Sequence, residues 1–145
     1  MAFVLQHTMA SRAPVPCYAE TMVIGIEHTA IASADHPALG RWYVETLGFV
    51  INYQSAGATF VKAPNGTMIE IISAEGERSA ATLKTPGLRH LALAVDNFDE
   101  VYASIKAKGV NFLTEPTSSK GNKLVFFTDP EGNILHLIER EKPLP

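Results

Sequence analysis

Four residues that can bind a metal ion occur at matched places in two similar stretches of the sequence. His28 and His90 each lie in an apolar stretch, and Glu70 and His136 each follow the glycine of a Pro-x-Gly turn by four positions. On a strand, each side chain would share a face with apolar or small neighbours. A buried ionisable group in such surroundings is costly unless it is paired or coordinates a metal. We therefore predict that these four residues hold one divalent metal ion.

An internal duplication accounts for this spacing. His28 precedes Gly48 by 20 positions, and His90 precedes Gly109 by 19. In each half, the hydrophobic pattern predicts a strand, a helix and then three further strands. A unit of about 55 residues buries too little surface to be stable alone, so we expect the two halves to pack together.

The expected elements can be placed along the chain. In the first half, strands are predicted at 24–32, 49–54, 59–62 and 67–73, with a helix that is capped by Asp35 and ends at Gly48. In the second half, strands are predicted at 88–95, 110–114, 123–128 and 133–139, with a helix that is capped by Asp96 and ends at Gly109. Residues 118–122 fit either a mobile loop or a hairpin. The expected organisation is a disordered N-terminal extension (1–22), a first module (23–73), a linker (74–87), a second module (88–140) and a C-terminal tail (141–145).

The composition excludes several classes of function. The 145 residues include 12 Lys and Arg, 15 Asp and Glu and one cysteine, with a net charge of −3. Without a basic cluster, the chain is not expected to bind nucleic acid, and no apolar run approaches the roughly 20 residues that cross a bilayer. Cys17 cannot form an intrachain disulfide, which favours a reducing, cytoplasmic location. Any metal site must use His, Asp and Glu.

Five motifs in a fixed order carry a resemblance to a known family. The stretches IEHTAIA, RWYVETLGF, PNGTMIEII, GLRHLALAV and FTDPEGNILHLIE lie within residues 24–140. Their order and spacing resemble the vicinal oxygen chelate superfamily, which includes glyoxalase I, methylmalonyl-CoA epimerase, extradiol dioxygenases and bleomycin-sequestering proteins. The resemblance implies an α+β fold of two tandem βαβββ modules that form a curved, partly open mixed β-barrel around a metal. Its ligands would come from the first and last strands of each module, here His28, Glu70, His90 and His136.

One departure from the family pattern affects the expected chemistry. The last ligand position is commonly a glutamate in the family's isomerases and dioxygenases, whereas here it is His136. Three imidazoles and one carboxylate suit Zn²⁺, Ni²⁺, Co²⁺ or Fe²⁺ better than Mg²⁺ or Ca²⁺. The metal would polarise a substrate carbonyl, and Glu70, the only carboxylate of the four, is the expected base. The resemblance thus implies a lyase or isomerase of the glyoxalase I or epimerase type, acting on a small molecule.

Two alternatives remain open at this point. An extradiol-type dioxygenase would cleave a catechol-like ring, although His136 replaces the glutamate that such enzymes use. A metal-free protein that sequesters a drug would not need the four ligands. Exposed strand edges favour a homodimer, and the linker permits a metal site within one chain or across two. Arg89 is expected to face away from its neighbour His90.

Overall fold

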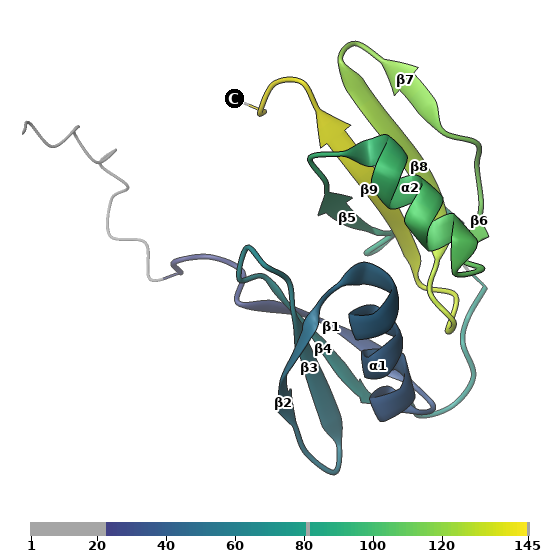
Figure 1. Cartoon of the computed structure of the whole chain (residues 1–145). Helices are drawn as coiled ribbons and strands as arrows, with labels where there is room; N and C mark the ends of the chain where they lie inside the picture. Colours follow the sequence, from purple (N-terminus) through teal and green to yellow (C-terminus); the bar gives the residue numbers. More distant parts are fainter. Residues whose placement is uncertain (1–22, 81, 145) are drawn as a thin grey trace, which may run out of the picture.

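The computed structural model describes residues 23–80 and 82–144, so the predicted extension at 1–22 lies outside the described part. The first module contains β1 (His28–Ser33), α1 (His36–Leu47), β2 (Val50–Gln54), β3 (Ala58–Lys62) and β4 (Met68–Ser73). Its sheet has the order β1-β4-β3-β2, in which β1 runs parallel to β4 and the other pairs are antiparallel. The helix between β1 and β2 packs on one face of this sheet (Figure 1).

The second module repeats this topology. It contains β5 (Leu91–Ala94), α2 (Phe98–Ala107), β6 (Asn111–Phe112), β7 (Thr117–Ser119), β8 (Asn122–Thr128) and β9 (Ile134–Arg140). The sheet order is β5-β9-β8-β6, and β7 pairs with β8 as a hairpin. The fold class is α+β, as predicted, with two mixed sheets that do not close on themselves. Neither helix in the described part of the chain is long and apolar enough to span a membrane.

The first strand of each module starts later than the sequence predicts. A strand over 24–32 was expected, but β1 begins at His28, which pairs with Met68 at the start of β4. Within the described residues, no strand pairs with residues 23–27, and Val23, Ile24 and Ile26 are largely exposed. Likewise, β5 begins at Leu91 rather than at 88. An alternating apolar pattern makes a strand only where another strand supplies hydrogen bonds.

The helix boundaries separate one correct capping prediction from one that is wrong. The Asp35 side chain accepts a hydrogen bond from the Ala38 amide at 2.9 Å, and Gly48 ends α1 in a left-handed conformation. The predicted cap at Asp96 is wrong, because Asn97 occupies the N-cap of α2 and makes no side-chain cap hydrogen bond. The helix begins one residue later because Phe98 is its first buried residue.

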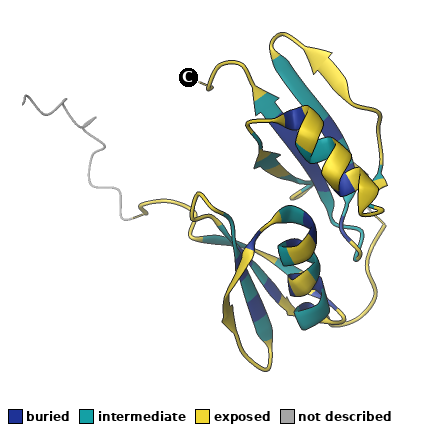
Figure 2. Ribbon diagram, in the orientation of Figure 1, coloured by how far each residue is buried: buried dark blue, intermediate teal, exposed yellow. Residues whose placement is uncertain are grey.

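Buried residues of both modules form one apolar core (Figure 2). Polar contacts of α1 also join the two modules. The hydroxyl of Tyr43, a fully buried residue, donates to Asp129 in the β8–β9 turn at 3.1 Å. Burial raises the pKa of Tyr43, so the phenol stays protonated and remains a donor. Lys108, which follows α2, donates to the carbonyls of Glu45 and Thr46 at the C-terminus of α1. The positive charge of Lys108 stabilises the C-terminus of α1, which is the negative end of the helix dipole.

Removing the Tyr43 hydroxyl tests this connection. The substitution Tyr43→Phe is expected to lower the free energy of unfolding by about 1.5–3 kcal/mol, the usual value of a hydrogen bond to a charged group. Urea denaturation measures the change. Tyr53→Phe is the matched control, since Tyr53 is exposed on β2, and should change stability by less than about 0.5 kcal/mol. Equal effects of the two substitutions would contradict a role for the Tyr43–Asp129 contact.

Candidate metal site

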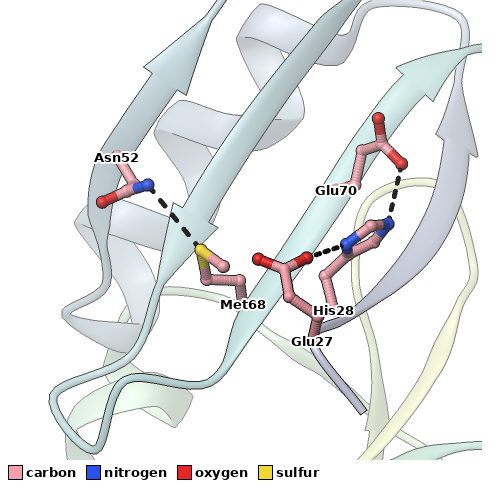
Figure 3. A network of polar contacts seen from close by, with 5 residues as sticks. All are labelled: Glu27, His28, Asn52, Met68 and Glu70. Carbon is pink, nitrogen blue, oxygen red and sulfur yellow. Dashed lines mark hydrogen bonds and ion pairs between the residues drawn. The ribbon is translucent and has the colours of Figure 1, made fainter. Parts of the chain in front are cut away.

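The first pair of predicted ligands lies together on neighbouring strands of the first module. His28 is the first residue of β1, and the register pairs Ala30 with Glu70, so both side chains project from the same face. The Nε2 atom of His28 lies 3.2 Å from a carboxylate oxygen of Glu70 (Figure 3). The two side chains are partly exposed, at 34% and 23%. A cation between them would therefore be reachable from outside the module.

Glu27 orients the His28 ring and was not singled out from the sequence. Its carboxylate contacts Nδ1 of His28 on the side of the ring opposite Glu70 (Figure 3). This hydrogen bond, together with the negative charges of Glu27 and Glu70, raises the pKa of His28. Metal-binding histidines usually donate their second ring nitrogen to a carboxylate or carbonyl, which fixes the tautomer. The arrangement leaves Nε2 as the nitrogen of His28 that is available to a metal.

The second pair lies at the equivalent place in the second module. His136 is on β9, whereas His90 directly precedes β5 rather than lying within a strand. The two rings are 4.7 Å apart between centroids. Nδ1 of His90 and both ring nitrogens of His136 are buried without a hydrogen-bond partner among the described residues. Burial, with a smaller effect of His90 and Arg140, lowers the pKa of His136 to about 4, so its imidazole is neutral.

Equivalent phenylalanines support both pairs. Phe60 on β3 is paired with Glu70, and Phe126 on β8 is paired with His136. Each also packs edge-on against the histidine of its module, with centroids 5.5 Å apart in both cases. The duplication therefore extends to the apolar backing of the ligands. The matched positions of Phe60 and Phe126 in the two halves of the sequence are the signal by which these rings could have been predicted.

The structure does not bring the four residues together within one chain. Among residues 23–80 and 82–144, no group of three His, Cys, Asp or Glu side chains is arranged to hold a metal ion. The pairs belong to two separate sheets, which occupy different halves of the molecule (Figure 1). The four predicted ligands are thus present as two separate pairs. A single ion could be held by all four only if the two pairs came from different chains.

The donor chemistry of the pairs fits a divalent metal. Orphaned imidazole nitrogens in a buried site are costly for the protein alone, because they have given up water without gaining a partner. Neutral imidazole nitrogen and carboxylate oxygen are ligands of zinc, nickel, cobalt and ferrous iron. His90 and His136 offer such nitrogens, and His28 and Glu70 offer one nitrogen and a carboxylate.

Two tandem βαβββ modules, each with a pair of potential ligands at the same place, define a duplicated α+β protein with a candidate metal site. The comparison with known families agrees with this class. A model described as the Glyoxalase/Bleomycin resistance protein/Dioxygenase superfamily matches residues 25–137. The chain belongs to this superfamily.

Two curated relatives are similar over most of their length. YwkD of Bacillus subtilis (strain 168) is 30% identical over 125 residues, covering 79% of this chain and 96% of that protein. YaeR of Escherichia coli (strain K12) is 32% identical over 126 residues, covering 79% and 95%. Both are described as uncharacterized proteins, so they support the family without indicating a reaction.

Solved structures show the same fold in proteins with different descriptions. A glyoxalase family protein from Enterococcus faecalis is 27% identical, with a TM-score of 0.69, covering 82% of this chain and all of that one. The oxidase ChaP-H2 is 23% identical, with a TM-score of 0.67 and coverages of 82% and 95%. TnmS3, an antibiotic binding protein from Streptomyces sp. CB03234, is 20% identical, with a TM-score of 0.67 and coverages of 84% and 100%. These last two similarities concern the fold alone.

Proposed function

We propose that the chain acts as a homodimer and catalyses proton transfer next to a substrate carbonyl, as a metal-dependent lyase or isomerase. In this proposal, His28 and Glu70 of one protomer hold a divalent metal together with the partner subunit's His90 and the partner subunit's His136. The observation that carries the proposal is the set of three buried ring nitrogens of His90 and His136 that have no hydrogen-bond partner within residues 23–80 and 82–144. A metal ion would satisfy one nitrogen of each ring, whereas an apolar ligand would satisfy none.

The surface of a single chain supports assembly from two copies. Val23, Ile24 and Ile26, which precede β1, and Leu88, which precedes β5, are exposed next to the two candidate pairs. Exposed apolar side chains next to a candidate site are the kind of surface that a second copy could cover. A two-fold dimer would place the first module of each copy against the second module of the other, which creates two equivalent sites.

The residues of the site have separate roles in the proposed reaction. When bound, the metal supplies Lewis-acid stabilisation of the negative charge that develops on the substrate oxygen. Glu70 is the base, because it is the only carboxylate among the four ligands and its side chain is 23% exposed. It would have to loosen from the metal to accept the proton. Glu27 holds the His28 ring in place, and Phe60 and Phe126 pack edge-on against His28 and His90.

A mixing experiment tests the site that is shared between chains. One variant carries His28→Ala and Glu70→Ala, and the other carries His90→Ala and His136→Ala. Neither alone can assemble a complete site, but a heterodimer has one intact and one empty site. After co-expression with two different tags, purified heterodimers are expected to bind about half of the wild-type metal content, measured by plasma mass spectrometry. Heterodimers without metal would contradict the shared site, and a metal-free wild type would overturn the proposed function.

A further inference from the structure

A pocket beside His90 contains two arginines that the sequence analysis did not connect with the site. It has a volume of about 340 Å³ and lies between the linker, the residues before β5 and the β8–β9 turn. Its polar lining consists of Arg78, Ser79, Arg89, His90 and Asn133. Arg89 was expected to face away from His90, but both line this pocket. Strand alternation does not apply to them, because β5 begins only at Leu91.

The guanidinium groups of Arg78 and Arg89 donate hydrogen bonds to uncharged oxygen atoms. Arg78 donates to the side-chain oxygen of Asn133 and to the carbonyl of Gly132, each at 3.0 Å. Arg89 donates to the carbonyls of Gly87 and Thr82 at 3.2 and 3.4 Å. In the part of the chain that the structure describes, neither arginine forms an ion pair with a carboxylate. The positive charge of the pocket is therefore not compensated, although the whole chain has a net charge of −3.

The carboxylates of the adjacent turn are engaged elsewhere. Glu131 accepts hydrogen bonds from the hydroxyl of Ser33 at 2.6 Å and from the amide of Ala34 at 3.1 Å. Asp129 accepts from Tyr43 and from Asn133. Both acidic groups thus serve the contact between the modules. The turn contributes neutral oxygen atoms to the pocket while its negative charges are directed away from it.

Asn133 fixes the position of Arg78. Its side-chain amide donates to Asp129 at 2.7 Å, which leaves its oxygen directed at Arg78. Asp129 is in turn held by the buried hydroxyl of Tyr43. A guanidinium that is held in this way is preorganised, so less conformational entropy is lost when it binds a planar or tetrahedral oxyanion.

We propose that this pocket binds an acidic group of the substrate, a carboxylate or a phosphate, through Arg78 and Arg89. The inference rests on the proposed function, because His90 lines the same pocket and would connect the anion site to the metal. The arginine fork matches the oxygens of a carboxylate or phosphate. The volume is at the small end of ligand sites, roughly 300–1,000 Å³, which suits a small oxo acid rather than a large conjugate.

Titration of the full-length protein as purified, with inorganic phosphate and with pyruvate as probes, tests the proposal. Binding is followed by NMR signals of the arginine Nε–H groups and of the Gly87 and Gly132 amides. Arg78→Met and Arg89→Met are each expected to weaken binding of the tighter probe by about tenfold or more, because a charged hydrogen bond is lost. Arg41→Met, an exposed position on α1, should leave the affinity unchanged. Methyl pyruvate, which lacks the charge, should not bind.

Failure of the anion site can be distinguished from failure of the proposed metal site. The metal content of Arg78→Met and Arg89→Met should equal that of the wild type, and His136→Ala should retain binding of phosphate or pyruvate. If the wild type contains no metal but loses anion binding in the arginine variants, the anion site stands and the proposed function fails. Absence of saturable binding of both probes, or equal affinity in the arginine variants, would overturn the inference.

Discussion

Replacing His136 with alanine is expected to abolish the proposed metal binding. Both ring nitrogens of His136 are buried and have no hydrogen-bond partner in the described part of the chain, and His136 is the most deeply buried of the four candidate ligands. Loss of residues that merely orient ligands typically costs about 10–100-fold in metal affinity, so loss of a ligand should cost at least about 100-fold. Metal content of protein purified without a histidine tag, measured by plasma mass spectrometry, gives the result.

A second substitution at the same position separates metal binding from folding. His136→Leu is expected to remove the metal but to raise the free energy of unfolding of the metal-free protein by about 1–3 kcal/mol, because two unsatisfied buried nitrogens disappear. His36→Gln serves as the control for metal content and should retain the wild-type amount of metal. Both ring nitrogens of His36 have hydrogen-bond partners outside the candidate site. A folded His136→Ala protein with its full complement of metal would refute the ligand assignment.

Replacing Glu70 with glutamine is expected to lower turnover by about 10²–10⁴-fold, the usual contribution of a general base. The amide keeps the shape of the side chain, and the three histidines remain, so the protein should stay folded and retain much of its metal. Because the proposed reaction removes a proton from carbon, it can be followed as deuterium uptake from D₂O next to the carbonyl of 2-oxo and 2-hydroxycarbonyl compounds. The compound that exchanges fastest with the wild type is then used for the variant.

Two further variants make this result specific. Glu75→Gln, at an exposed position after β4, should exchange at the wild-type rate. Glu27→Gln should reduce metal affinity by about 10–100-fold, with turnover restored when metal is added, because Glu27 only orients His28. Wild-type exchange by Glu70→Gln would show that another group accepts the proton.

The sequence predicted the elements of the fold better than their ends. Asp35 and Gly48 mark the two ends of α1, as expected, because the capping signals there are unambiguous. At α2, Asp96 and Asn97 are both good capping residues, and the burial of Phe98 decides between them. At β1, the alternating pattern continues upstream of His28, but β4 provides partners only from Met68 onward. Boundaries therefore depended on tertiary contacts that a local pattern does not contain.

The candidate site was predictable in its parts and not in its assembly. The duplication placed His28 with Glu70 and His90 with His136, and both pairs are in contact in the structure. How the modules are oriented depends on contacts such as Tyr43 with Asp129 and Lys108 with the end of α1. These join residues more than 60 positions apart. Arg78, in the linker, was missed for the same reason, because its position is set by the β8–β9 turn of the second module.

The separation of the two ligand pairs has a consequence for how such a protein would respond to its surroundings. If an ion must bridge two copies, metal affinity and self-association are thermodynamically linked, and each strengthens the other by the same factor. Dilution would release the ion, and chelation would dissociate the copies. The amount of active enzyme would then rise faster than linearly with the concentration of chains. The expression level itself would therefore control activity.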